Sequence, residues 1–311
     1  MLKYIYTVLN TSNKDTYVLQ NLAIIALFAL IFHIYKMKNQ AEFGENVEGF
    51  DQVEPFVLKR DQDVYDETYS TMYDTLSKTV TRSNWEIENI LKMTDADKRN
   101  SVFLDVGSCS GYKVNRLQEL GYVAYGVDKS KDMIDRSHRL FSEIVVKEGD
   151  VMEPMLFERD TFTHIMCLNF TIYEFENKTQ FFSNCYYWML PNSYLLLHLV
   201  EPRDFKPTMT SGKNTAKGRV TDTLVEFYDF NYNSQYKFSN EKTDNNVIFT
   251  QTITDKKTKN IRQYEQTLYM DDITDIIKLA NKSGFIFHGK MSMSGFNKDE
   301  HQYLYVLERA L

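Results

Sequence analysis

Cysteine is scarce in this chain of 311 residues, with only three present. They are Cys109, Cys167 and Cys185, an odd number that lacks the paired spacing of a zinc site. A chain of this length can bury a substantial core without disulfide staples. The cysteine content therefore excludes a disulfide-rich secreted scaffold and favours a reducing compartment.

An excess of positive charge is also lacking. Lys and Arg number 36 against 43 Asp and Glu, a formal net charge of −7. The overall field repels a phosphate backbone and no local basic stripe offsets it, which argues against nucleic acid as a partner. We also expect no metal site, because no cysteine or carboxylate lies at ligand spacing from any of the histidines, which are His33, His138, His164, His198, His288 and His301.

Long apolar runs are rare, with one exception near the start, YVLQNLAIIALFALIFHIY from Tyr17 to Tyr35. As a helix, this run covers close to the ~30 Å of a bilayer core. The two tyrosines fall where an aromatic belt lies, and Lys36 and Lys38 follow as interfacial anchors. We predict a single-pass transmembrane helix over residues 17–37, with a buried helix of a soluble fold as the alternative.

The segments around this run are simpler. Residues 1–16 form an N-terminal tail, and residues 38–55 form an acidic linker without a sustained apolar period. Residues 56–98 are expected to form a helical cap. Its helices carry tyrosines at helical spacing, namely Tyr65, Tyr69 and Tyr73.

Residues 101–202 alternate short β-rich runs with amphipathic segments, the pattern of βαβ units around a parallel sheet. Gly121 ends the first intervening helix, and Ser130 caps the second. The expected strands are Val102–Val106, Val123–Val127, Ile144–Val146, Phe162–Phe170 and Tyr194–Val200.

The pattern changes after this core. Residues 220–270 alternate apolar with polar side chains between polar turns, which predicts an antiparallel β meander. Residues 271–311 contain a helix and two closing strands. Together with the core, these segments form one α/β domain over residues 99–311.

The first expected strand runs into a glycine loop, Gly107-Ser-Cys-Ser-Gly111, and consecutive strands end at Asp105, Asp128 and Asp150. Parallel strands bring their carboxyl ends to one edge of the sheet, where ligands bind. The loop lacks the G-x-G pair of a dinucleotide site, which argues against a nicotinamide-dependent oxidoreductase. Carboxylates at this edge favour a cofactor with an ammonium or sulfonium group.

Five segments in order, LDVGSCSG, YGVDKSKDMID, EGDVMEP, THIMCLNFTIYEF and LPNSYLLLHLVEP, resemble class I S-adenosylmethionine-dependent methyltransferases. The resemblance covers residues 101–202. It implies a seven-stranded Rossmann-like sheet with helices on both faces and S-adenosylmethionine as the cofactor. It is closest to the small-molecule type, including members encoded by large DNA viruses.

The resemblance also implies which residues contact the cofactor. They are Asp105, Gly107 and Gly111 around the methionine half, Asp128 at the ribose hydroxyls, Lys129 and Met133 near the adenine, Asp150 and Val151 at the adenine amino group, and Asn169 facing the methyl donor. Cys109 departs from the pattern, because the family has its middle glycine there.

Methyl transfer is an in-line displacement, which gains most from alignment and sometimes uses a general base. The candidates for catalysis are Asn169, Tyr173 and His198. His198 lies in an apolar strand, where a hydrogen-bonded core role is the alternative. Further candidates for substrate contact are Thr171, Glu174, Glu201 and Arg203.

The leading hypothesis is a membrane-tethered methyltransferase with its catalytic domain in the cytosol, acting on a small-molecule or lipid-like acceptor. A nucleic-acid methyltransferase is the first alternative, although the place of an N-P-P-[YFW] signature reads Asn169-Phe-Thr-Ile. A non-catalytic binding module, in which Cys109 marks a degenerate cofactor loop, is the second.

Overall fold

The structure, a computed structural model, describes residues 24–30, 52–205, 213–214, 221–226, 230–238 and 245–310. Contacts divide the chain into residues 1–47 and 48–311. Residues 24–30 are helical. Apart from them, the predicted anchor over residues 17–37 lies outside the described residues, as do the tail and most of the linker. No helix within the described part of the chain has the length and apolarity to cross a membrane.

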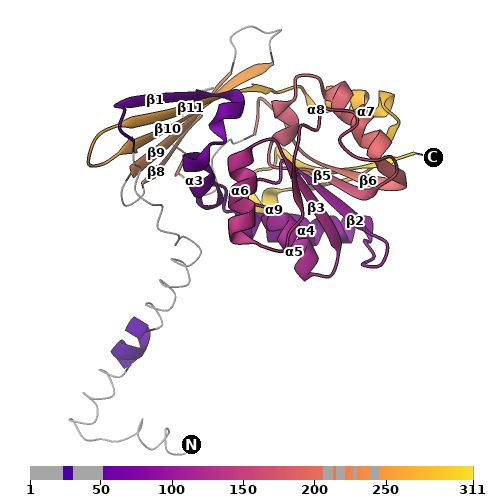
Figure 1. Cartoon of the computed structure of the whole chain (residues 1–311), viewed down its shortest axis with the longest axis horizontal. Coiled ribbons are helices and arrows are strands. Elements are labelled where there is room, and N and C mark those ends of the chain that lie inside the picture. The colour runs from indigo at the N-terminus through magenta and orange to yellow at the C-terminus, as the bar shows by residue number, and fades with distance from the viewer. Residues whose placement is uncertain are drawn as a thin grey trace, which may run out of the picture. The chain divides into compact units, whose positions relative to one another are not determined.

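A seven-stranded mixed sheet forms the centre of the larger unit, in the order β12-β13-β6-β5-β2-β3-β4 (Figure 1). Strands β2 to β6 are parallel, and β13 runs antiparallel to both β6 and β12. This order confirms the predicted Rossmann-like α/β fold. The strands are β2 (Val102–Val106), β3 (Val123–Asp128), β4 (Val146–Glu148), β5 (Phe162–Cys167), β6 (Met189–Val200), β12 (Phe285–Ser292) and β13 (Gln302–Arg309).

Helices cover both faces of this sheet (Figure 1). On one face, the apolar side chains of α4 (Thr79–Thr94), α5 (Tyr112–Glu119) and α6 (Lys131–Leu140) pack in one hydrophobic cluster. On the other face, α7 (Lys178–Trp188) and α8 (Ile273–Lys282) contribute to a second cluster. Both clusters bury residues of the central strands, which explains why those strands are apolar on both sides.

A second sheet has the order β1-β11-β10-β9-β8-β7. Its strands are β1 (Phe56–Arg60), β7 (Lys213–Asn214), β8 (Thr221–Glu226), β9 (Phe230–Phe238), β10 (Asn246–Asp255) and β11 (Ile261–Tyr269). Strands β7 to β11 run antiparallel, and the buried residues of β9 and β10 alternate as in a half-exposed sheet.

The N-terminal part of the expected helical cap differs from the prediction. Residues 56–60 form strand β1, which pairs in parallel with β11, Phe56 opposite Ile261. The edge of β11 offers unpaired backbone groups, and the run FVLKR can extend to satisfy them. The cap itself consists of α3 (Glu67–Ser77) and α4, with short helices η1 (Asp61–Val64), η2 (Thr171–Glu174) and α9 (Ser294–Asn297) elsewhere.

Helix α3 connects the two sheets. It lies against the second sheet through Tyr69, whose ring is 5.1 Å from that of Tyr264 and whose hydroxyl donates to Gln251. On its other side, Asp74 of α3 pairs with Arg136 of α6 at 3.2 Å. Side chains of α3 and β11 also share a cavity wall with Cys109 after β2 and Asn169 after β5, so α3 and the second sheet lie at the carboxyl edge of the parallel strands.

Candidate active site

The loop after β2 brings backbone amides to the carboxyl edge of the sheet. Gly107 and Ser108 donate their N–H groups to the carbonyl of Val127 in β3, at 2.9 and 3.0 Å. Gly107 and Gly111 adopt φ angles of +65° and +75°, and a Cβ at Gly111 would collide with the side chain of Ile144. Glycine is therefore required at Gly111, and at Gly107 it avoids both the strain of the positive φ and a close contact with Thr171, whose Cγ2 would lie 3.0 Å from a Cβ.

Cys109 stands between these glycines with a φ of +49°. This left-handed conformation costs a residue with a Cβ about 1 kcal/mol, which explains why glycine is the easier choice. Its N–H donates to Asp128 Oδ2 at 2.8 Å, and its thiol donates to the carbonyl of Gly107 at 3.3 Å. Burial raises the pKa of the Cys109 thiol, so the group is protonated at neutral pH.

Asp128 ends β3 in the wall of a cavity of about 560 Å³. Its Oδ1 accepts the N–H of Ser130 at 2.9 Å, and Oδ2 accepts that of Cys109. Burial raises the pKa of Asp128, and these amide bonds oppose the rise. A carboxylate has further acceptor sites, so Asp128 retains the capacity to bind ligand hydroxyls.

Asp150 and Val151 line the same cavity after β4, together with Lys129. Lys129 Nζ lies 2.7 Å from Asp150 Oδ2, and the N–H of Met152 donates to Oδ1 at 2.9 Å. Burial acts to raise the pKa of Asp150, but these two hydrogen bonds lower it overall. Asp150 is therefore ionised and held in place.

Asp105 lies beneath the glycine loop, outside the cavity wall, and is 1% exposed. Neither of its carboxyl oxygens has a hydrogen-bond partner among the described residues, and Lys113 Nζ is 3.8 Å away. Burial raises the pKa of Asp105 to about 7. Gly111 and Met133 are likewise buried outside the cavity wall.

A second cavity of about 910 Å³ adjoins the first under α3. Residues common to the two walls are Tyr65, Cys109, Thr171, Glu174 and Gln266. Asn169 lines only the second cavity, and its Nδ2 donates to the hydroxyl of Tyr73 at 2.7 Å. Asn169, which the resemblance placed at the methyl donor, therefore lies in the wall of the second cavity and not in that of the first.

Glu174 puts a carboxyl group in the wall between the cavities. The hydroxyl of Tyr65 donates to Glu174 Oε1 at 2.6 Å, and Gln266 Nε2 donates to the same hydroxyl at 3.0 Å. Burial raises the pKa of Glu174 to about 7, although the bond from Tyr65 lowers it. The sequence placed Glu174 only among possible substrate contacts, because its direction depends on the turn of η2.

Tyr173 and His198, the other two catalytic candidates, lie outside both cavity walls and are fully buried. The hydroxyl of Tyr173 accepts the N–H of Val200 at 2.8 Å. His198 bonds Arg82 at 3.2 Å and Gln302 at 3.1 Å, and burial lowers its pKa well below the usual value. Both side chains are therefore hydrogen-bonded within the core, and neither faces a cavity.

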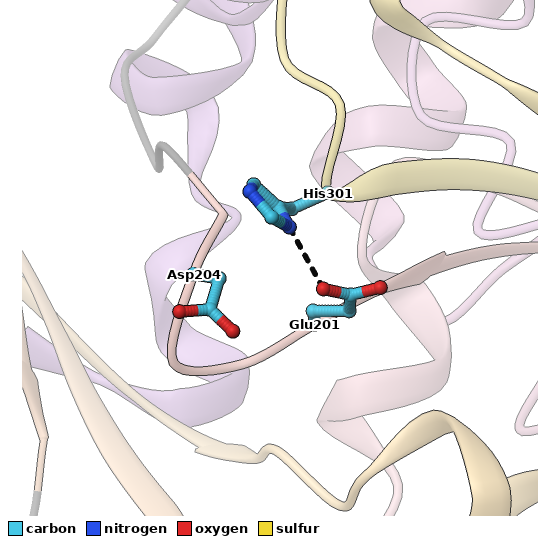
Figure 2. Close-up of side chains that lie close together, drawn as sticks. All are labelled: Glu201, Asp204 and His301. Atoms are coloured by element: carbon cyan, nitrogen blue, oxygen red, sulfur yellow. Dashed lines mark hydrogen bonds and ion pairs between the residues drawn. The ribbon is translucent and has the colours of Figure 1, made fainter.

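Glu201, Asp204 and His301 come together after β6, with ligand atoms within 4.8 Å of one another (Figure 2). His301 Nδ1 lies 2.7 Å from Glu201 Oε2, and the hydroxyl of Tyr303 donates to Oε1 at 3.1 Å. The sequence spacing gave no sign of this group, because 100 residues separate Glu201 from His301. Arg203 beside it is exposed.

The strand order and the glycine loop define a Rossmann-like methyltransferase fold, and the comparisons agree. The profile of the methyltransferase domain family matches residues 104–197, from β2 into β6. No curated protein matches the chain in sequence.

Several solved structures share the fold. A S-adenosylmethionine-dependent methyltransferase from Clostridium acetobutylicum has 12% identity and a TM-score of 0.60, covering 78% of this chain and 98% of its own. The amino pentose methyltransferase CalS10 from Micromonospora echinaspora, solved with S-adenosylmethionine bound, has 15% identity and a TM-score of 0.54, covering 75% and 96%.

The sugar N-methyltransferase KedS8 from a Streptoalloteichus species has 16% identity and a TM-score of 0.51, covering 74% of this chain and 87% of its own. Because these identities are low, the structural similarity establishes the fold alone. Together with the domain match, they support S-adenosylmethionine as the cofactor.

Proposed function

We propose that the chain is an S-adenosylmethionine-dependent methyltransferase that acts on a small molecule. The observation that carries this proposal is the pair of adjoining cavities. One lies at the carboxyl ends of the strands with Asp128 and Asp150 in its wall, and the other lies under the aromatic face of α3. Cofactor and acceptor would meet at their common wall.

The residues of the first cavity fit the cofactor. Asp128 would accept hydrogen bonds from the ribose hydroxyls, and Asp150 and Val151 would contact the adenine. The methionine half would lie along the loop that begins at Gly107. Asp105 lies beneath the loop, outside the cavity wall, where its buried carboxyl group is 3.8 Å from Lys113, and its negative charge would act on the cofactor's cationic groups across the loop. The bound cofactor supplies an electrophilic methyl group on a sulfonium.

The second cavity supports a small acceptor rather than a nucleic acid. Its wall is rich in aromatic side chains, among them Tyr69, Trp85, Phe170 and Tyr236. Apolar concave walls of this kind suit a small molecule. The names of two structural neighbours, an amino pentose methyltransferase and a sugar N-methyltransferase, point to the same class of acceptor.

Glu174 is the proposed proton acceptor. Methyl transfer to an N–H or O–H group replaces a hydrogen of the acceptor, so one proton must leave. The Glu174 carboxylate faces the common wall and can take that proton, while Tyr65 and Gln266 hold it in place. A base with a pKa near neutrality suits this task.

Cofactor binding tests the proposal. Calorimetry on the full chain is expected to show heat with both S-adenosylmethionine and S-adenosylhomocysteine, and Asp128→Ala should weaken both by about a hundredfold, because two charge-assisted hydrogen bonds are lost. Asp135→Ala is the matched control, since Asp135 is exposed and pairs with Lys131 on the surface of α6.

Two results would contradict the proposal. The first is no heat with either nucleoside, which would favour the non-catalytic binding module. The second is equal affinity in Asp128→Ala and Asp135→Ala, which would remove the first cavity as the site.

Membrane attachment through residues 17–37 is part of the proposal, with the catalytic domain on the cytosolic side and a lipid-like acceptor within reach. It rests on the apolar run in the sequence. The full chain is expected to stay with membranes after a carbonate wash, and the double variant Ala26→Arg, Leu27→Arg should be released. Leu9→Arg, outside the run, should remain bound. Release of the unaltered chain would reject the anchor.

A further inference from the structure

We propose that the second cavity binds its ligand through an anionic group, a carboxylate or a phosphate, which pairs with the guanidinium of Arg82. The inference rests on the proposed function only in taking this cavity as the acceptor site. The anionic group would lie outside the wall shared with the cofactor cavity, so the acceptor would be anchored away from its reacting atom.

Arg82 has the features of a built anion site. It lies on the first turn of α4, is 8% exposed, and lines the second cavity. Its Nε donates to Glu86 Oε1 at 2.8 Å, and its Nη2 donates to His198 Nδ1 at 3.2 Å. Buried arginine is the usual residue for planar recognition of carboxylate and phosphate, because its donors have a fixed geometry.

A chain of hydrogen bonds fixes the guanidinium further. Because His198 Nδ1 accepts from Arg82, the proton of the neutral ring lies on Nε2, which donates to Gln302 Oε1 at 3.1 Å. Gln302 Nε2 in turn donates to Asp299 Oδ2 at 2.8 Å. Helix α4, strand β6 and strand β13 thus hold Arg82 in one orientation.

Donors of Arg82 remain for a ligand. A guanidinium carries five N–H groups, and Glu86 and His198 account for two of them. No other side chain within the described segments bonds Arg82. Among the described residues, no nitrogen of Arg82 is both buried and without a partner, so the remaining donors are open to the cavity and available to an anion.

The charged side chains in the wall of the second cavity also favour an anionic group. Arg82 and Glu86 cancel formally, but Lys78 and Lys298 are exposed in the same wall, and neither has an ion pair among the described residues. Glu174 is the one carboxyl group of the described lining, and it lies in the wall shared with the first cavity. The part of the cavity around Arg82 is therefore positive.

The rest of the cavity wall indicates the chemistry of the uncharged part of the ligand. Its largest side chains are aromatic, namely Trp85, Phe170, Tyr236, Phe249 and Phe296, and they stand among smaller polar side chains such as Thr81 and Asn169. Such walls favour a flat or apolar body. The class of ligand that fits is a ring or apolar skeleton with one anionic substituent.

Binding of simple probes to the full chain tests the inference. The probes are benzoate, phenyl phosphate and the neutral isostere benzamide, titrated by ligand-observed NMR with and without S-adenosylhomocysteine. At least one anion is expected to bind about tenfold more tightly than benzamide. A preference for benzoate would indicate that the anchoring group of the natural ligand is a carboxylate. A preference for phenyl phosphate would indicate a phosphate.

Variants locate the effect. The double variant Lys78→Ala, Lys298→Ala changes only exposed side chains and should lower the preference for the anion only modestly, because Arg82 remains. Arg82→Met with Glu86→Met replaces the buried pair by apolar side chains and should abolish it, without leaving a single buried charge. Lys92→Ala is the matched control, because Lys92 is an exposed lysine of the same helix that pairs with Glu88 outside the cavity.

Equal binding of benzamide and both anions would overturn the inference, as would an anion preference in Arg82→Met, Glu86→Met equal to that in Lys92→Ala, or one that is lost entirely in Lys78→Ala, Lys298→Ala. The outcome is independent of cofactor binding. If the chain preferred anions but bound no S-adenosylmethionine, the anion site would be supported and the proposed methyltransferase activity would be rejected.

Discussion

Replacing Asp105 by asparagine is expected to stabilise the cofactor-free protein above pH 7 while weakening its binding of S-adenosylmethionine. Asp105 is 1% exposed, and its oxygens have no hydrogen-bond partner within the described residues. Burial raises its pKa from 3.8 to about 7. Ionising this carboxyl group in the fold therefore costs free energy that an amide does not require.

The sign of the pH dependence follows from the raised pKa. Below pH 3.8, Asp105 is protonated in both the folded and unfolded chain, so its titration contributes nothing. Between pH 3.8 and about 7, the unfolded chain ionises first and the folded state loses stability. Above pH 7 the loss is complete, and a difference of this size corresponds to as much as about 4 kcal/mol.

Urea unfolding at pH 5 and pH 8 checks this expectation. The gain in the free energy of unfolding of Asp105→Asn over the unaltered chain should be larger at pH 8 than at pH 5. Asp135→Asn should show no such gain, because Asp135 is exposed and paired. Calorimetry should also show weaker binding of S-adenosylmethionine, since the variant removes the negative charge beneath the glycine loop that would attract the cofactor's ammonium group. A variant destabilised at pH 8, or one with undiminished affinity, would contradict the argument.

Asp105 became a candidate from the sequence because its position conflicts with packing. An aspartate at the end of an apolar strand, followed by two glycines, is unfavourable for packing alone, and such local violations mark functional positions. Asp128 and Asp150 became candidates by a different route, as acids at the ends of neighbouring strands. Their place on consecutive parallel strands follows from the alternation of strand and helix.

Features that depend on distant partners were not visible. Strand β1 forms because Phe56 meets Ile261 in β11, and no pattern within the run FVLKR indicates that partner. The choice between Tyr173 and Glu174 is set by the short turn of η2, which buries the first and directs the second to the common wall. Single-sequence patterns report which face of a regular element is buried, and they lose this power in such turns.

His198 illustrates a further limit. It lies in β6, a central strand buried on both faces, so period-two alternation cannot separate a ligand-facing side chain from a core side chain. Only the contact with Arg82 reveals its role in orienting the guanidinium. Arg82 itself carried no signal, because an arginine on an amphipathic helix is ordinarily a solvated side chain.

Replacing Glu174 by glutamine is expected to lower methyl transfer by about a hundredfold or more, the usual contribution of a positioned base. The amide retains an oxygen that can accept from the hydroxyl of Tyr65, so the fold and the affinity for S-adenosylhomocysteine should be unchanged. Transfer of a labelled methyl group from S-adenosylmethionine into a metabolite and lipid extract measures the rate. Treating the extract with nuclease should leave the labelled product intact.

The pH profile separates a proton acceptor from a merely structural carboxyl group. Burial places the pKa of Glu174 at about 7, and only the ionised form accepts a proton. In the unaltered chain, methyl transfer should therefore rise with pH up to about 7 and level off above it, whereas the residual transfer by Glu174→Gln should lack this step. Glu176→Gln is the matched control, because Glu176 lines the cofactor cavity but not the second cavity. A step at pH 7 that persists in Glu174→Gln would show that another group accepts the proton. A full rate in that variant would leave the alignment of cofactor and acceptor as the source of catalysis.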